Sequence, residues 1–340
     1  MFYNRIGNLL EAVNGNACLI TDKINQFYLT GISLDGFWLF LSKEKSCLIS
    51  GDLLAGQLKE LLPNAEIITT QNYLKTLRTL CKETGNKTLC VNFTALSYVL
   101  GSKIGQFCKV ADISQTLSEL RKLKDSLEIV AIRKSCVLAS KAMNFAQKSV
   151  KKSISEIELK LKIEQFLLKN NAAPAFETIV ACGPNSANPH HICTTRKILP
   201  NDLVMIDIGA LLGGYSSDLT RTFVFGKITQ LQRTVIATVK AAKEAAAKKL
   251  KTGIKTSVID AFARVVIEHA GFGNKFIHTT GHGLGIEVHE APRLSANDTS
   301  TLKKNMLVTI EPGIYLPGLF GVRIEDTYLL TEQGNEVLTK

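Results

Sequence analysis

Two segments of the chain concentrate side chains of the types that bind hard or borderline metal ions. One is VMIDIGALLGGYSSDLTRTF, and the other runs from HTTGHGLGIEVHE through TIEPGIY to VRIEDTYLL. Together they supply five candidate ligands, which are Asp207, Asp218, His282, Glu311 and Glu325. Carboxylates and an imidazole, with no cysteine among them, suit a pair of divalent cations at a hydrolytic centre. The sequence therefore predicts a two-metal hydrolase.

The first two candidate ligands lie on a predicted β-hairpin. LVMIDIG and YSSDLTRTF are strand-like, and a tight turn at Leu212-Gly213 would place Asp207 directly opposite Asp218, with Cβ atoms about 4.5–5.5 Å apart. Two bare carboxylates at that distance repel, so one stays protonated unless a cation lies between them. The alternative is two unrelated surface residues. Metal ligation is favoured because a lone ionised Asp207 would be costly to bury in an apolar strand.

His282 is the candidate imidazole ligand. It lies between Gly281 and Gly283, and glycine permits positive φ as well as close approach of neighbouring groups. His278 precedes it by four residues and His289 follows it by seven. A lone histidine is usually structural, but three in one glycine-rich segment favour a site.

The other histidines are less distinctive. His269 lies in the helical stretch ARVVIEHAG and is assigned a structural role. His190 and His191 are adjacent in NPHH, and the role of His191 stays open.

The last carboxylates follow or lie within short strands. Glu311 ends the apolar run LVTI, which Pro312-Gly313 interrupts. Arg323 and Glu325 are two apart, so both project from one face of a strand. A guanidinium beside a ligand carboxylate can orient it or bind a substrate oxygen. The alternative is a surface ion pair on an edge strand.

The elements that position these residues form two predicted domains. Residues 1–118 alternate short strands with helices: ACLIT, FYLTG, FWLFLS, SCLISG, AEIITT and KTLCVNF are strand-like, whereas LLAGQLKELLP and NYLKTLRTLCKE are helical. This alternation predicts an α/β domain. It contains no histidine, so it supplies no imidazole, and we assign it to support and assembly.

Residues 119–340 have a different pattern. A helix is predicted from Leu117 to Val150, and a second is opened by a capping box of Ser153 with Glu156. After strand-like segments, two more helices are predicted over 229–253 and 257–270. The order of two helices and strands, repeated, indicates two similar halves.

Composition limits the class of protein. A chain of 340 residues with 45% apolar and 21% charged residues is typical of a globular protein with two domains. It shows no membrane-spanning run and no secretory signal. Its eight cysteines are scattered, which favours reduced thiols and a cytoplasmic location.

The formal charge of +11 has two interpretations. It could indicate a nucleic-acid or acidic-membrane partner. However, the lysines lie at helical spacing in amphipathic segments such as TVKAAKEAAAKKLKTG, and no nucleic-acid motif is present. We therefore expect solvated helix faces, with neither nucleic acid nor membrane as a partner.

These motifs, in this order, resemble the pita-bread metallopeptidases (creatinase, aminopeptidase P and prolidase), and within them the Xaa-Pro aminopeptidase and Xaa-Pro dipeptidase branch. The matching blocks are PAFETIVACGPNSANPHH, MIDIGALLGGYSSDLTRTF, HTTGHGLGIEVHEAP, TIEPGIY and GVRIEDT. The resemblance implies an α+β protein. Its catalytic domain, residues 119–340, has two αα-plus-strand halves around a curved antiparallel sheet. Residues 1–118 would be a creatinase-type α/β domain that helps to close the site and build a homodimer.

The resemblance also implies a role for each candidate residue. The metal ligands would be Asp207 on one ion, His282 and Glu311 on the second, and Asp218 and Glu325 bridging both. Glu311 would accept a proton from the attacking water. The substrate-binding residues, which together with Glu311 form the catalytic set, would be His190, His278, His289 and Arg323. Of these, His289 would donate to the oxygen of the scissile carbonyl. We expect two Mn²⁺ ions, although Co²⁺, Zn²⁺ or Fe²⁺ suit the same ligands.

The implied reaction is hydrolysis of the Xaa-Pro peptide bond. The sequence favours an Xaa-Pro aminopeptidase, which releases the first residue of proline-containing peptides. The main alternative is a prolidase acting on Xaa-Pro dipeptides only. A methionine aminopeptidase is less favoured, because such enzymes usually lack the N-terminal domain and the Arg two residues before the last Glu. A non-enzymatic binding protein, or a creatinase-like hydrolase without metal, is disfavoured because no ligand is missing.

Overall fold

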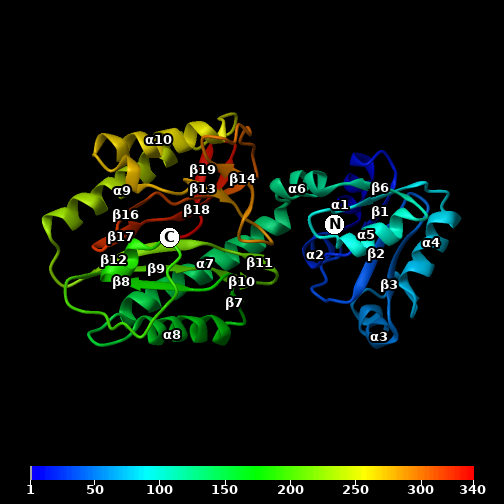
Figure 1. The fold of residues 1–340 in the computed structure, drawn as a ribbon, viewed down its shortest axis with the longest axis horizontal. Coiled ribbons are helices and arrows are strands. Elements are labelled where there is room, and N and C mark those ends of the chain that lie inside the picture. Colours follow the sequence, from blue (N-terminus) through cyan, green and yellow to red (C-terminus); the bar gives the residue numbers. More distant parts are fainter. Residues whose placement is uncertain (1) are drawn as a thin grey trace. The chain divides into compact units, whose positions relative to one another are not determined.

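The computed structural model describes residues 2–340, which divide into two compact units between Arg121 and Lys122 (Figure 1). The first unit contains a mixed six-stranded sheet in the order β4-β3-β2-β1-β5-β6. Its elements are α1 (Phe2–Ala12), β1 (Ala17–Ile20), α2 (Lys23–Thr30), β2 (Phe37–Leu41), β3 (Ser46–Ser50), α3 (Asp52–Leu61), β4 (Glu66–Thr69), α4 (Tyr73–Glu83), β5 (Thr88–Val91), α5 (Tyr98–Gly105), β6 (Lys109–Asp112) and α6 (Ser114–Lys122).

One predicted strand of this unit is wrong. FYLTG lies at the end of α2 rather than in a strand. Asp22 caps this helix by accepting a hydrogen bond from the backbone N–H of Asn25, and Gly31 ends it at φ 74°. The cap and the glycine outweigh the β propensity of the aromatic and branched residues between them.

The second unit contains four antiparallel sheets and two helix pairs. Figure 1 shows α7 and α8 along one side of the strands and α9 and α10 along the other. The elements are α7 (Ser126–Ser149), α8 (Glu156–Lys169), β7 (Ala173–Pro174), β8 (Ile179–Cys182), η1 (Gly183–Ala187), β9 (Asp202–Ile208), β10 (Ala210–Leu212), β11 (Tyr215–Ser216), β12 (Leu219–Phe225), α9 (Gln230–Lys249), α10 (Thr256–His269), η2 (Gly273–Lys275), β13 (Gly281–Gly283), β14 (Glu290–Leu294), β15 (Leu307–Ile310), β16 (Gly313–Leu316), β17 (Phe320–Arg323), β18 (Asp326–Thr331) and β19 (Gly334–Val337).

The helix predicted from Leu117 to Val150 is two helices. α6 ends at Lys122, and Asp125 starts α7 with a capping box in which Glu128 bonds back to the Asp125 backbone. The apolar period continues across the break, which is why the sequence pattern alone did not reveal it.

The capping box of α8 is also displaced from its predicted place. Ser155 and Glu158 form it, whereas Ser153 lies in the preceding turn at φ 70°. Glu156 is therefore available for another role, because its side chain is not needed for the cap.

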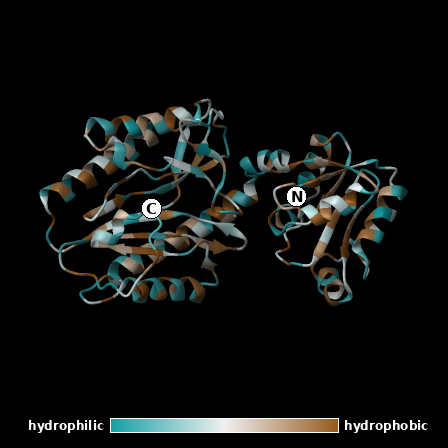
Figure 2. Cartoon of the chain, in the orientation of Figure 1, coloured by the Kyte–Doolittle hydropathy of each residue, from teal (hydrophilic) through white to brown (hydrophobic). Residues whose placement is uncertain are grey.

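The second unit is built from two halves with matching backbone connections. Each helix pair covers its own buried core: α7 and α8 with β8, β9 and β12 in the first half, and α9 and α10 with β15 to β18 in the second. Figure 2 shows that these helices carry both hydrophobic and hydrophilic residues, as expected for helices with one buried face. Two backbone hydrogen bonds recur, with Ser153 N to Ile198 O matched by Gly253 N to Leu302 O, and Glu156 N to Arg196 O matched by Thr256 N to Ser300 O.

Two further observations concern the helices and the cysteines. Among residues 2–340, no helix combines the length and apolar character needed to cross a membrane. The eight cysteines are free thiols, and all but Cys193 are buried.

Candidate metal centre

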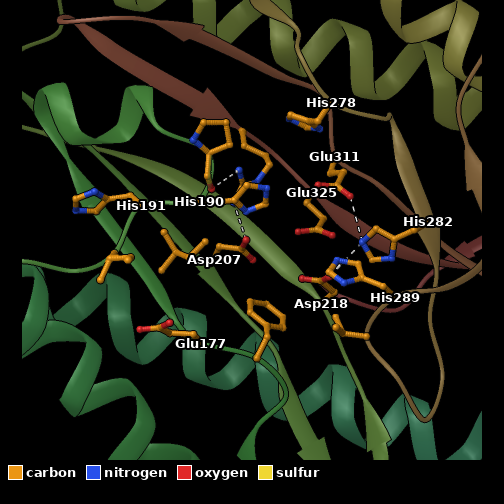
Figure 3. Close-up of a pocket in the computed structure, with 16 residues that line it drawn as sticks. Glu177, His190, His191, Asp207, Asp218, His278, His282, His289, Glu311 and Glu325 are labelled. Atoms are coloured by element: carbon orange, nitrogen blue, oxygen red, sulfur yellow. Dashed lines mark hydrogen bonds and ion pairs between the residues drawn. The ribbon is translucent and has the colours of Figure 1, made fainter. Parts of the chain in front are cut away.

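One cavity of about 270 Å³ in the second unit gathers the predicted functional residues. Figure 3 shows carboxylates and imidazoles from β9, from the segments around β13, from the end of β15 and from the start of β18 pointing toward its centre. All nine predicted residues line it, namely Asp207, Asp218, His190, His278, His282, His289, Glu311, Arg323 and Glu325. Residues more than 100 positions apart in the chain therefore share one pocket.

The first two carboxylates come from the β9–β12 hairpin, but their register differs from the prediction. The turn is Gly213-Gly214, with φ of 59° and 81°, one residue later than expected. Both turn positions need positive φ, which two glycines supply. The register pairs Asp207 with Thr220, so the prediction that Asp207 lies directly opposite Asp218 is wrong. Because Asp218 precedes Thr220 by two residues, the two carboxylates become diagonal neighbours.

His282 lies opposite an irregularity in β14: it pairs with Arg293 whereas Gly283 pairs with Glu290, so two residues of β14 are left unpaired between them. A bulge redirects a side chain locally. Neither flanking glycine has positive φ. Instead, a Cβ on Gly281 would lie 2.0 Å from Thr309 O, and a Cβ on Gly283 would lie 2.3 Å from Ala291 O. The glycines are therefore required for close approach of neighbouring strands.

Glu311 and Glu325 are held through their backbones. Glu311 directly follows β15, and its N–H donates to Thr280 O at 2.8 Å. Glu325 lies between β17 and β18, and its N–H donates to Thr220 O at 3.0 Å. The Thr220 hydroxyl also donates to Glu325 Oε2 at 2.7 Å. Thr220 thus joins the hairpin of the first half to the last carboxylate.

Arg323 contacts a different carboxylate from the one its sequence position suggests. We predicted a guanidinium beside Glu325, two residues away. Its Nη2 instead lies 2.6 Å from Asp207 Oδ2, while Nη1 donates to the Tyr315 hydroxyl at 2.9 Å and Nε to the Thr220 hydroxyl at 3.1 Å. Arg323 is 4% exposed. Its charge therefore compensates Asp207 inside the pocket.

The remaining carboxylates are electrostatically unequal. Burial and the neighbouring charges of Glu325 and Asp207 raise the pKa of Asp218 well above its usual range. Burial and the charges of Glu311 and Asp207 raise the pKa of Glu325 in the same way. Burial also acts to raise the pKa of Glu311, but the hydrogen bond and charge of His282 outweigh it and lower that pKa to about 2. Two of the four carboxylates are thus unfavourable as anions unless further positive charge is added.

The donor set fits divalent cations. One ligand atom each from Asp218, His282 and Glu325 lies within 4.8 Å of the others. His282 Nε2 lies 3.2 Å from Glu311 Oε1 and 3.5 Å from Asp218 Oδ2. Asp207 Oδ1 and Glu325 Oε1 are buried without any hydrogen-bond partner. Buried, unpartnered carboxylate oxygens are costly, and a cation would satisfy both.

The other histidines surround this cluster. The His278 Nε2 lies 2.9 Å from the Tyr315 hydroxyl, and burial lowers its pKa. The ring of His289 packs edge-on against that of His282, with 4.4 Å between centroids. Burial and the charge of His282 lower the pKa of His289, so it is neutral at neutral pH and retains one N–H donor. His190 lies exposed at the rim of the pocket.

Two residues bonded to this site were missed from the sequence, and so was the role of a third residue outside it. Thr220 alternates with Asp218 and could have been found from strand periodicity. Tyr315 lies in TIEPGIY, but nothing local predicts that it links His278 to Arg323. Glu156 was interpreted as part of a capping box, and its contacts are described below.

Comparison with known proteins follows the same division of the chain. Residues 130–332 match the family described as metallopeptidase family M24, and residues 3–123 match the creatinase/prolidase N-terminal domain. An Xaa-Pro dipeptidase of Pyrococcus furiosus is 37% identical over 350 residues, covering 99% of this chain and 97% of that protein.

Solved structures agree over the same extent. An Xaa-Pro dipeptidase from Bacillus anthracis superimposes with a TM-score of 0.96 at 30% identity, covering 100% of this chain and 98% of that chain. An X-Pro aminopeptidase from Thermotoga maritima superimposes with a TM-score of 0.90 at 29% identity, covering 98% and 97%. The similarity therefore includes both units.

Proposed function

The chain belongs to metallopeptidase family M24, and from this premise we propose that it is an Xaa-Pro dipeptidase, or prolidase. The predicted family and fold class, a pita-bread domain after a creatinase-type α/β domain, are confirmed. The sequence favoured an Xaa-Pro aminopeptidase. The similar proteins favour the alternative, because proteins named Xaa-Pro dipeptidase match almost the whole chain at 30% to 37% identity.

The observation that carries the proposal is the buried group of carboxylates with two unpartnered oxygens. Family membership implies divalent metal ions. We assign two ions, with Mn²⁺ preferred, to the predicted ligands Asp207, Asp218, His282, Glu311 and Glu325. When bound, such ions lower the pKa of a water molecule and polarise a peptide carbonyl.

The side chains of the chain itself carry the remaining steps. Glu311, whose pKa is about 2, is ionised at neutral pH and is assigned to accept the proton of the attacking water. The neutral His289 donates its N–H to the carbonyl oxygen as negative charge develops there, and His190 is assigned to assist it. The proline nitrogen carries no hydrogen, so it must gain a proton before it can leave. We assign that proton to Glu311.

The walls of the cavity suit the substrate. Phe176, Ile179, Ile192 and Val288 line it together with the polar residues. Apolar side chains of this kind can pack against a proline ring, while His278 and Arg323 hold the carboxylate cluster in place through Tyr315 and Asp207.

Assembly and location complete the proposal. We assign residues 1–118 to dimer formation and to closure of the site, and residues 119–340 to catalysis. The expected assembly is a homodimer in the cytoplasm that binds proline-containing peptides, with neither nucleic acid nor membrane as a partner.

An assay of the Mn²⁺-loaded protein on Ala-Pro, Ala-Pro-Ala and Met-Ala tests the proposal. A dipeptidase hydrolyses Ala-Pro and leaves Ala-Pro-Ala intact. Cleavage of Ala-Pro-Ala at a comparable kcat/KM would restore the aminopeptidase interpretation. Turnover of Met-Ala alone would indicate a methionine aminopeptidase, and no turnover of any peptide would contradict the proposed activity.

A further inference from the structure

Glu156 is a buried carboxylate that the proposed mechanism does not use. It is the first residue of α8, and its side chain is fully buried. Oε1 accepts from Cys182 N and from Asn185 Nδ2, both at 2.9 Å. Oε2 accepts from Thr194 N at 3.0 Å and from the Thr194 hydroxyl at 2.7 Å, and it lies 2.8 Å from His191 Nε2. One carboxylate thus binds four separate residues, a concentration of donors that ordinary helix capping does not need.

All four partners lie within one segment, residues 182–194. This segment contains η1 but no strand beyond Cys182, and Ser186 Oγ also accepts from Gly321 N at 2.8 Å. His190 occupies the part of it that lines the pocket. On one side of His190, the Pro189 carbonyl accepts from Arg323 Nη1 at 3.2 Å. On the other side, His191 is held by Glu156 and points away from the carboxylates in Figure 3. The residues on both sides of His190 are therefore held by hydrogen bonds.

The second half of the unit has a corresponding contact between the start of α10 and its facing loop, but that loop carries no pocket histidine. Thr256 corresponds to Glu156, because each is the first residue of its helix and donates its N–H to the facing loop. The Thr256 hydroxyl donates to Asp298 O at 2.6 Å and lies 3.3 Å from Asp298 Oδ1. Asp298 in turn accepts from the N–H groups of Arg293 and Ser300, both at 2.8 Å.

The helix–loop contacts at Glu156 and at Thr256 differ, and the difference shows which bonds of Glu156 are additional. In the second half the helix supplies a threonine and the loop a carboxylate, with no histidine involved. In the first half the helix supplies the carboxylate, and Thr194 supplies the hydroxyl. Joining helix to loop thus requires only one threonine hydroxyl bond, which in the second half goes to the Asp298 carbonyl. The additional bonds to His191, Asn185 and Cys182 belong to the segment that carries His190.

The charge on Glu156 is maintained by these bonds. Burial acts to raise its pKa, but the hydrogen bonds from His191, Cys182, Thr194 and Asn185 lower it below its usual value. A buried carboxylate is stable only when it is bonded in this way.

We infer that Glu156 is a positioning residue: through His191 and the ends of the 182–194 segment, it holds His190 at the pocket for contact with the substrate. This inference rests on the proposed function of His190. Glu156 does not line the pocket, so its effect on turnover should pass through the position of His190.

A double-mutant cycle tests the inference. Glu156→Gln keeps the shape of the side chain but replaces one acceptor with a donor, so at least one anchor is lost. We expect kcat/KM on Ala-Pro to fall about 10- to 100-fold, since small displacements of a binding group have effects of this size. In a His190→Ala background, Glu156→Gln should cause no further loss, with manganese content unchanged throughout. Losses that multiply in the double variant, or no loss in the single one, would overturn the inference.

Asp298→Asn is the matched control, because it makes the same chemical change at the corresponding connection in the other half. It should lower thermal stability without changing kcat/KM on Ala-Pro by more than about twofold, as expected for a change remote from the site. If Asp298→Asn reproduces the loss seen for Glu156→Gln, the effect is general destabilisation and the inference fails. If Glu156→Gln does not fold, His191→Ala replaces it in the same cycle.

Amide hydrogen exchange gives a second readout that is independent of substrate. Glu156→Gln should accelerate exchange across residues 182–194 while leaving residues 290–300 unchanged. Unchanged exchange in the first segment would refute the positioning role even if the wild-type protein proved inactive on Ala-Pro. Inactivity of the wild type with accelerated exchange in the variant would instead contradict the proposed function alone.

Discussion

The two halves of the second unit place a carboxylate at the end of a corresponding strand but compensate its charge differently. β9 follows Asn201 at φ 71° and β15 follows Asn305 at φ 66°, and the strands lead to Asp207 and to Glu311. Asp207 is bound by a guanidinium, Arg323, that comes from the opposite half. Glu311 lies against the imidazole of His282, from its own half.

This difference shows how a repeated framework acquires an asymmetric site. The shared features are backbone connections and turns, which any suitable sequence can supply. The chemistry depends on side chains that are not repeated. The first half provides the two aspartates of the pocket and the adjacent histidines His190 and His191. The second half provides its other three imidazoles.

The largest expected effect comes from removing one carboxylate from each half. Asp218→Ala and Glu311→Ala should each reduce kcat on Ala-Pro by at least about 10³-fold, because both remove a proposed metal ligand and Glu311 also serves as the proton acceptor. Circular dichroism should show an intact fold in both. Normal turnover of either variant in the presence of excess Mn²⁺ would show that the substituted carboxylate is not required for catalysis.

The histidines test whether the second half dominates contact with the substrate. His289→Ala should lower kcat by about 10²- to 10³-fold, because a hydrogen bond to the developing oxyanion is lost. Manganese content, measured by elemental analysis, should stay near that of the wild type. A variant that loses its metal instead would show that His289 acts as a ligand.

Arg323→Lys tests the link between the halves. Lysine keeps the positive charge but cannot bond Asp207, Tyr315 and Thr220 together, so we expect kcat/KM to fall about tenfold. The Mn²⁺ concentration needed for half-maximal activity should also increase. Measuring activity across a manganese titration would separate the two effects. Full activity at all manganese concentrations would mean that the charge alone is sufficient.

The smallest effect is on the stability of the metal-free protein. Asp218 and Glu325 have raised pKa values in the folded state, so the folded state binds more protons than the unfolded chain as pH rises above about 4. Their contribution to stability is therefore fully present below the unfolded pKa and is lost as pH rises toward the folded pKa.

In a chelator-treated sample, the Tm of the wild type should rise when the pH is lowered from 8 to 5. This rise should be several degrees larger than the rise in the Asp218→Asn variant, because each unit of pKa shift is worth about 1.4 kcal/mol. Mn²⁺ should raise the wild-type Tm at pH 8 by binding the folded state. Identical dependence of Tm on pH in the two proteins would show that the pKa of Asp218 is not raised in the metal-free folded state.

Much of the architecture could be predicted from the sequence. Apolar periodicity and turn residues located five of the six strands of the first unit and the helix pairs of the second. Errors arose where two local signals competed, as in FYLTG, where Asp22 and Gly31 define a helix despite strand-forming residues between them.

The chain by itself determined the inventory of the site: which acids, imidazoles and guanidinium are present, their order, and the glycines beside His282. These follow from residue type and spacing alone. Tertiary structure decided which groups meet. Moving one turn by a single residue re-paired Asp207 with Thr220, and Arg323 reached Asp207 rather than the nearby Glu325. Local sequence cannot specify such contacts, because they depend on strand register and on packing between segments that fold separately.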